Sequence, residues 1–529
     1  MLPEPGSTWP PPELGPALDK WREWSAWWTG SPDLLAEVYG GRYAGGPNIG
    51  HRPSQYQGGI VGALARMWWG RPTPPHETEE KLHVPLAGDL CRAASDMLFS
   101  EPLTATSEDD ATSDRLEELL DDSGQARLSE AAETVAALGG GYLRVVYDKT
   151  VSDRAWFDVV APDAAIPVWS WGHLREVTFW RQLACIDGKV WRHFEHHEPG
   201  WIRHGLYEGE AGKVGRLVPL QDRPETRGLA ELVNADAAIA TGYPLLDCTY
   251  IPQQLPNPAW RGKPLLAPMG RSVLDTCEPM LDALDMCWSS WMRDLDLGRG
   301  RVVVPGSWLD DHGPGRGASF DPGRRWFTPV EGALKMERPE VVQFAIRVQE
   351  HADTAANLVR QVLRRAGFAP GSLGEQGDGV AITATETHAR ERRSFITRGR
   401  AIGYWRPALG QRALPALLAI DAHAFGRQVD LGQPVNVEFA DSVQPDELTV
   451  ATTAEMLGRA QAASIETRVR MVHPDWVDDQ VLAEVARIRE DAGGGMPAPF
   501  DYGGGPTETD DQRTALGDQP DGEPTEEQA

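Results

Sequence analysis

Two runs of apolar side chains, spaced about 3.5 residues apart, occupy the middle of this chain. The later run alternates spacings of four and three through Val341, Ala345, Val348, Ala352, Ala355, Val359, Val362 and Ala366. The earlier run follows nearly the same rule through Val273, Cys277, Met280, Leu284, Cys287, Trp291 and Leu295. A seam of this period favours long helices that pack lengthwise. Two readings remain open, namely an antiparallel helix pair inside one core and a seam between subunits.

The residues before these two runs have a pattern typical of β-strands. β-branched and aromatic residues alternate or cluster, and short polar or Gly-containing connections separate them, as in meandering hairpins. The expected strands cover 142–148, 155–162, 174–183, 189–197 and 201–209. Helices are expected at 85–100 and 127–138, where apolar residues recur at helical spacing. The sequence therefore predicts an α+β fold.

The two ends of the chain differ from its middle. Residues 1–20 are rich in proline, and we expect them to be poorly ordered. A helical, Trp-rich segment follows, with Trp21, Trp24, Trp27 and Trp28. Residues 498–529 consist largely of small, polar and acidic residues with almost no large apolar side chain, which predicts a disordered acidic tail.

Charge and cysteine content exclude several classes of protein. The 529 residues carry a net charge of −27, so the chain as a whole cannot neutralise nucleic-acid phosphates. The five cysteines form no CxxC pair, which indicates free thiols in a reducing compartment. No run of 18 or more apolar residues occurs, so we expect no membrane partner.

Motifs that would indicate catalysis are absent. Gly-Lys pairs at 188–189, 212–213 and 262–263 are followed by Val, Val and Pro, so no phosphate-binding P-loop is present. Neither GxSxG nor HExxH occurs. We therefore expect no enzyme, no catalytic residue, no bound cofactor and no metal.

One group of histidines leaves two readings open. It comprises His193, His196, His197 and His204. In a strand, His193, Glu195 and His197 would share one face, which makes a metal site conceivable. The favoured reading is that these are exposed polar positions of a hairpin.

Two further segments are candidates for contact with a partner. After a helix that ends near Gly367, residues 367–381 are rich in glycine and lack Lys and Arg; the residues of interest are Gly371, Ser372, Gly374, Glu375, Gln376, Gly377 and Asp378. The next helix should start near Thr383, where a capping box begins, and it carries Arg390, Arg392, Arg393, Arg398 and Arg400. Either these arginines pair with acidic neighbours, which we favour, or they form a band facing DNA or another subunit.

The order of these elements resembles that of the Siphovirus-type portal proteins of tailed bacteriophages. The similar stretches are PLAGDLCRAASDMLFSEP (85–102), DVVAPDAAIPVW (158–169), LDALDMCWSSWMRDLDLGRGRVVVP (281–305), ITATET (382–387), VNVEFADSVQPDE (435–447) and SIETRVRMVHPDWVDDQVLAEVARI (464–488). The resemblance covers about residues 80 to 492. The Trp-rich N-terminal segment and the acidic tail are not hallmarks of that family.

The resemblance implies a portal-type division of the chain. An N-terminal Trp/Pro/Gly-rich segment (1–80) precedes an α+β wing (81–270). A first stem helix (271–297), a β-containing clip (298–338), a second stem helix (339–366) and a tunnel loop (367–381) follow. A helix and the closing strand of the wing (382–448), a helical crown (449–497, two helices broken at His473–Pro474) and the disordered tail (498–529) complete the chain.

The resemblance also implies a function. Portal proteins form a ring of about twelve subunits, at one capsid vertex of the virion, through which double-stranded DNA is packaged and ejected. The implied partners are the terminase and the capsid, scaffold and head–tail connector proteins, with assembly in the host bacterial cytoplasm. The alternatives are a nucleic-acid- or polysaccharide-processing enzyme and a cytosolic scaffold without a channel.

Overall fold

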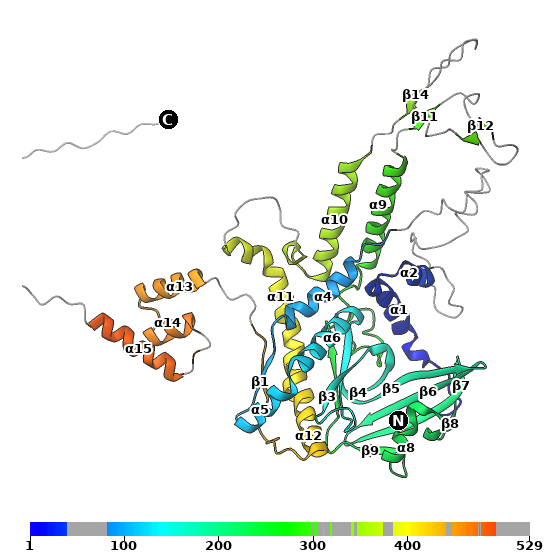
Figure 1. Ribbon diagram of the computed structural model, residues 1–529, viewed down its shortest axis with the longest axis horizontal. Helices are drawn as coiled ribbons and strands as arrows, with labels where there is room; N and C mark the ends of the chain where they lie inside the picture. The colour runs from blue at the N-terminus through cyan, green and yellow to red at the C-terminus, as the bar shows by residue number, and fades with distance from the viewer. Residues whose placement is uncertain are drawn as a thin grey trace, which may run out of the picture. The chain divides into compact units, whose positions relative to one another are not determined.

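A computed structural model describes residues 1–39, 82–297, 301–303, 310–311, 318–319, 340–342, 346–373, 384–440, 447–473, 476 and 478–493. The chain divides into two compact units, Met1–Ser442 and Val443–Ala529, and each is described by itself. The first unit mixes helices and sheets, which confirms the α+β prediction (Figure 1). Among the described residues, no helix combines the length and apolar character needed to cross a membrane.

The largest sheet is an antiparallel meander, as predicted. Its order is β4-β5-β6-β7-β8, and β9 pairs with β7. The strands are β4 (Ala165–Ser170), β5 (His173–Ile186), β6 (Lys189–Glu198), β7 (Trp201–Glu210), β8 (Lys213–Val218) and β9 (Ala238–Ala240). Tight turns with glycine at positive φ join β4 to β5, β5 to β6 and β6 to β7, and these turns fix the register of the meander.

A second sheet has the order β10-β2-β3, all antiparallel. Its strands are β2 (Gly140–Val146), β3 (Trp156–Val160) and β10 (Cys248–Pro252). Helix α6 (Asp122–Leu138) runs into β2 through Gly139, whose φ of 83° closes the helix in the left-handed conformation. The buried apolar face of α6 packs with β2, β3, α5, α11 and α12 in one hydrophobic core.

Helices make up much of the rest of the first unit, and α9 and α10 extend side by side away from the sheets (Figure 1). Those of the first unit are α1 (Gly15–Thr29), α2 (Pro32–Tyr39), α4 (Leu86–Phe99), α5 (Asp110–Leu119), α6, α7 (Pro224–Arg227), α8 (Leu229–Leu232), α9 (Glu278–Leu297), α10 (Val348–Ala366), α11 (Ala384–Ala408) and α12 (Leu414–Phe425). A π-helical segment, Leu409–Ala413, joins α11 to α12. Short 3-10 helices cover Pro12–Leu14, Pro162–Ala164, Leu220–Asp222 and Pro370–Leu373. The helices predicted at 85–100 and 127–138 correspond to α4 and α6.

The N-terminal residues are not poorly ordered, contrary to the sequence prediction. Trp9 is buried, and its ring packs edge-on against Trp180 at 4.8 Å and Phe194 at 5.1 Å. Trp21 and Trp24 of α1 are also buried, in a core shared with α4, α9 and α10. The large apolar area of each indole offsets the entropy of ordering a proline-rich segment.

The two long seams form helices, although both helices start later than predicted. α9 begins at Glu278 rather than at 271, because the preceding turns are bonded to α6, where Val273 N–H donates to the Ala136 carbonyl. α10 begins at Val348 rather than at 339. Val341 instead lies in strand β14 (Glu340–Val342), which pairs with β11 (Arg301–Val303). The β-branched valines on both strands favour this pairing.

Shorter strands complete the first unit, and the second unit is helical. β1 (Thr104–Thr106) pairs with β15 (Asn436–Glu438), inside the segment where a strand was predicted, and β12 (Asp310–Asp311) pairs with β13 (Ala318–Ser319). The second unit contains α13 (Glu447–Arg459), α14 (Ile465–Val472) and α15 (Asp478–Gly493). Two helices were predicted here, but Gln461 at φ 52° and the N-cap Ser464 add a second break.

Candidate functional site at a helical hairpin

Helices α9 and α10 lie side by side within one chain (Figure 1). Ala355 and Val362 of the second seam are buried in the same core as Leu281 and Leu284 of α9. The Cys277 thiol lies 3.9 Å from the Val362 carbonyl oxygen. Of the two open readings of the seam, the structure therefore shows the antiparallel pair inside one core.

The far end of the hairpin is held by polar contacts and leads into short strands. Asp294 near the end of α9 lies 2.8 Å from the Arg347 guanidinium and 3.0 Å from His351 Nε2. Beyond the helices, β11 pairs antiparallel with β14, so the two chain segments stay together past the helix ends. Short strands were expected within residues 298–338, and β11 is one of them, whereas residues 320–338 lie outside the described part of the chain.

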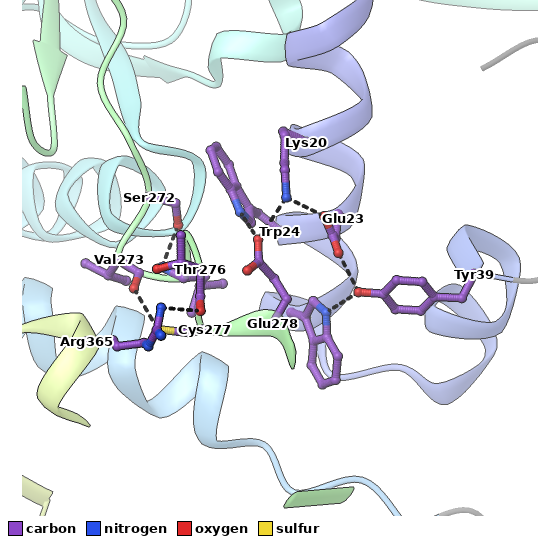
Figure 2. A network of polar contacts seen from close by, with 12 residues as sticks. Lys20, Glu23, Trp24, Tyr39, Ser272, Val273, Thr276, Cys277, Glu278 and Arg365 are labelled. Carbon is purple, nitrogen blue, oxygen red and sulfur yellow. Dashed lines mark hydrogen bonds and ion pairs between the residues drawn. The ribbon is translucent and has the colours of Figure 1, made fainter. Parts of the chain in front are cut away.

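A buried polar network fastens the base of this hairpin to α1 (Figure 2). The Lys20 ammonium donates to Glu23 at 2.8 Å and to Glu278 at 3.1 Å. The Trp24 indole N–H donates to the same Glu278 oxygen at 3.0 Å. Tyr39 donates to Glu23 at 2.6 Å, which extends the network to α2.

Glu278 is the acceptor at the centre of this network. It is the first residue of α9, where the partial positive charge of the helix N-terminus favours a carboxylate. Burial raises the pKa of Glu278, and the Lys20 charge opposes that rise. The last turn of α10 also reaches this point, because the Arg365 guanidinium donates to the Thr276 carbonyl at 3.3 Å (Figure 2).

A second set of polar contacts lies about two to three turns farther along α9. The buried Asp285 carboxylate accepts from the Val84 backbone N–H at 2.8 Å and lies 2.8 Å from His83 Nδ1. The Ser289 hydroxyl accepts from the Leu82 backbone N–H at 3.0 Å. The segment leading into α4 is thereby tied to the face of α9.

The acidic residues of α9 were not singled out in the sequence, although their spacing indicates that they share one face of the helix. Glu278, Asp282 and Asp285 recur at spacings of four and three, and all three are buried. The buried apolar residues Cys277, Leu281 and Leu284 follow the same spacing one position earlier. A polar stripe parallel to an apolar seam indicates that the helix buries a second face.

The glycine-rich loop is described only at its start. Gly367 ends α10, as predicted, and its φ of 91° gives the helix a left-handed C-cap. Gly371 and Ser372 belong to the 3-10 helix Pro370–Leu373 rather than to an extended loop. Gly374, Glu375, Gln376, Gly377 and Asp378 lie outside the described residues.

The predicted basic residues all lie on α11. Arg398 donates to the backbone carbonyls of Met97, at 2.7 Å, and Ala440. Arg393 donates to the Arg364 carbonyl at 2.6 Å. Arg392 and Arg400 are exposed, and the side chain of Arg390 lies outside the described part of the chain. Two of these arginines therefore donate to backbone carbonyls, of α10 in one case and of α4 and the segment after β15 in the other.

The histidine group is not exposed, contrary to the favoured reading of the sequence. His193, His196, His197 and His204 are all buried in the main sheet. Burial lowers the pKa of His193 and of His204 to about 4, so both rings are neutral at pH 7. Burial alone would lower the pKa of His197 too, but the Asp247 and Glu195 carboxylates raise it to about 9. The predicted shared face is confirmed, because Glu195 lies 3.4 Å from His193 and 3.9 Å from His197.

Among known proteins, the chain is similar to several solved structures. No family model and no curated protein matches the chain. The chain is similar to the neck of a native GTA particle computed with C12 symmetry, at 14% identity and a TM-score of 0.41, over 78% of this chain and 99% of that chain. It is also similar to the neck of an empty GTA particle computed with C6 symmetry, at 13% identity and a TM-score of 0.38, over 77% and 97% of the respective chains.

Proposed function

We propose that this chain is a portal-type subunit, which assembles into a closed ring of about twelve copies around a DNA channel at a capsid vertex. One observation carries the proposal: an antiparallel pair of long helices, interrupted by a strand-containing insertion, stands on an α+β body in the element order that the sequence shares with phage portal proteins. In this proposal α9 and α10 form the stem, and residues 298–338 form the clip.

The network at the base of the hairpin supports a mechanical role. A stem that bears mechanical load needs a rigid base. Lys20 holds Glu278 of α9 to α1, and Asp285 of α9 accepts from the segment before α4. The Glu278 and Asp285 carboxylates are buried, so an arrangement that removed their partners would leave a desolvated charge unpaired, which disfavours other geometries.

The net negative charge of the chain supports a channel through which DNA slides rather than one that binds it tightly. The chain carries −27, and each phosphate that a protein neutralises adds affinity through counterion release. Arg393 and Arg398 already donate to backbone carbonyls within the subunit. A channel built from such subunits holds DNA loosely, so a separate terminase would supply the packaging energy.

The remaining assignments follow from the same proposal. Residues 81–270 with 382–448 form the wing, 449–497 the crown, and 367–381 a tunnel loop that faces the DNA. The clip contacts the terminase during packaging and the head–tail connector afterwards. Capsid and scaffold proteins surround the ring, which is assembled in the bacterial cytoplasm and retained in the virion. No enzymatic activity is part of this proposal.

Stiffening the tunnel loop tests the channel directly. Gly374→Pro with Gly377→Pro removes backbone freedom without adding charge. The DNA content of assembled particles should fall well below that of wild type, while the matched pair Gly374→Ala and Gly377→Ala should package close to normally. Full-length packaging by the proline variant would contradict the proposed role of the loop.

A further inference from the structure

Three side chains from β6 and β7 meet on one face of the main sheet. His193 and Glu195 are two residues apart on β6, so they point to the same side. His204 of β7 stands directly opposite Glu195 in the strand register. The potential ligand atoms of these three residues all lie within 4.8 Å of one another.

Each of the two imidazoles in this group has one buried nitrogen that makes no hydrogen bond in the described part of the chain. The rings of His193 and His204 are nearly parallel, at 5°, and His193 Nε2 lies 3.3 Å from His204 Nδ1. The other nitrogens, His193 Nδ1 and His204 Nε2, are buried and make no hydrogen bond within the described part of the chain. A buried polar atom left unpaired is costly, so these atoms call for a ligand.

Glu195 offers one oxygen to the same space. The Arg144 guanidinium pairs with Glu195 Oε2, and it also bonds Asp158 at 2.7 Å. Glu195 Oε1 is turned toward His193 Nδ1, at 3.4 Å. Arg144 therefore fixes the carboxylate while leaving one oxygen for a cation, and its own charge weakens the affinity of the site.

A cavity of about 210 Å³ reaches one member of this group, His204. His204 is the one titratable side chain among its lining residues, and the others are mostly apolar, including Leu206, Val218 and Leu220. An ion can approach His204 through this cavity, and water there can complete its coordination.

We propose that His193, Glu195 and His204 bind one divalent transition-metal ion, zinc by donor type, which joins β6 to β7. Two imidazole nitrogens and a carboxylate oxygen with an open fourth position suit Zn²⁺. Side-chain rotation can close the present spacing to the about 3.3 Å expected between ligands of a tetrahedral ion with bonds of about 2.0–2.1 Å.

A neighbouring group of similar composition is less suited. His197, Asp247 and Cys248 are also close together and buried. However, His197 Nδ1 already lies 2.8 Å and 2.9 Å from the two Asp247 oxygens. Burial also raises the pKa of the Cys248 thiol well above its usual value, so the thiolate that zinc requires is disfavoured.

Zinc titration of the full chain tests the proposal. The protein is produced without a polyhistidine tag, stripped with a chelator and titrated with Zn²⁺ in a calorimeter. We expect one site per chain with micromolar affinity, weakened at least tenfold by His193→Gln and by His204→Gln. His196→Gln is the matched control, because His196 lies on the same strand but faces the other side, bonded to Thr178 at 2.9 Å.

A spectroscopic measurement on the unaltered chain guards against misfolded variants. Loading with Co²⁺ should give the ligand-field absorption of a tetrahedral nitrogen–oxygen site without a thiolate charge-transfer band. A thiolate band would place the ion at one of the free cysteines and overturn the assignment. Absence of a stoichiometric Zn²⁺ site, or equal binding by all three variants, would overturn it as well.

Discussion

The Lys20 ammonium lies 3.1 Å from the Glu278 carboxylate, although the two residues are 258 positions apart in the chain. This contact joins α1, which begins within the residues 1–20 that we expected to be poorly ordered, to the first residue of α9. The base of the helical hairpin is therefore built partly from the N-terminal segment. We therefore expect a substitution at either residue to destabilise the hairpin as well as the N-terminal segment.

Removing the Glu278 carboxylate should destabilise the first unit. Glu278→Ala leaves the buried Trp24 N–H without its acceptor, whereas Lys20 keeps Glu23. We expect a loss of about 1–3 kcal/mol in the free energy of unfolding, the usual cost of a buried unsatisfied donor. The measurement is the denaturant midpoint at an unchanged slope. Glu13→Ala, at an exposed position, should change the midpoint little, and equal effects of the two variants would contradict this account.

Two glycines at positive φ, Gly139 and Gly172, separate the cost of backbone strain from the cost of steric overlap with a new Cβ. A Cβ on Gly139 would lie 2.8 Å from backbone atoms of Arg271 and Ser272, whereas one on Gly172 would meet nothing within 4 Å. We expect Gly172→Ala to cost about 1–2 kcal/mol from the left-handed backbone alone. Gly139→Ala should cost about 1–3 kcal/mol more through overpacking. Thermal unfolding of both variants tests the order, which a similar melting temperature for the two would refute.

The N-cap of α6 should show a defined pH dependence. Burial would raise the pKa of Asp121, but hydrogen bonds from Ser123, Arg154 and the Gly124 backbone lower it to about 2. Because the folded pKa is lowered, the stabilisation is present above pH 3.8 and is lost as the pH falls through about 2.

Asp121→Asn keeps an acceptor oxygen but removes the charge. Since Asp121 is largely solvated, we expect the wild type to exceed this variant by less than about 1 kcal/mol at pH 7. The difference should shrink when the denaturant midpoints are compared at pH 3. A difference that stays constant from pH 7 to pH 3 would show that the charge of Asp121 is not involved.

The sequence predicted individual helices and strands better than the tertiary contacts between them. The strands around residues 140–210 and the end of α10 at Gly367 follow from side-chain alternation and from the left-handed C-cap, which are local properties. Burial of His193 and His204 could not be predicted in the same way. It depends on the register of β6 against β7 and on the elements that cover that face. Trp9 and Glu278 were missed for the same reason, because their partners lie far away in the chain.

Electron microscopy of the purified full chain tests the central claim most directly. The account predicts closed rings with a central hole, cyclic symmetry of about twelve, and a particle mass of about twelve times the 58.0 kDa of one chain. The hairpin of α9 and α10 should be found around that hole in the averaged map. A monomer at high protein concentration, or an open filament without a closed ring, would contradict the portal-type assignment.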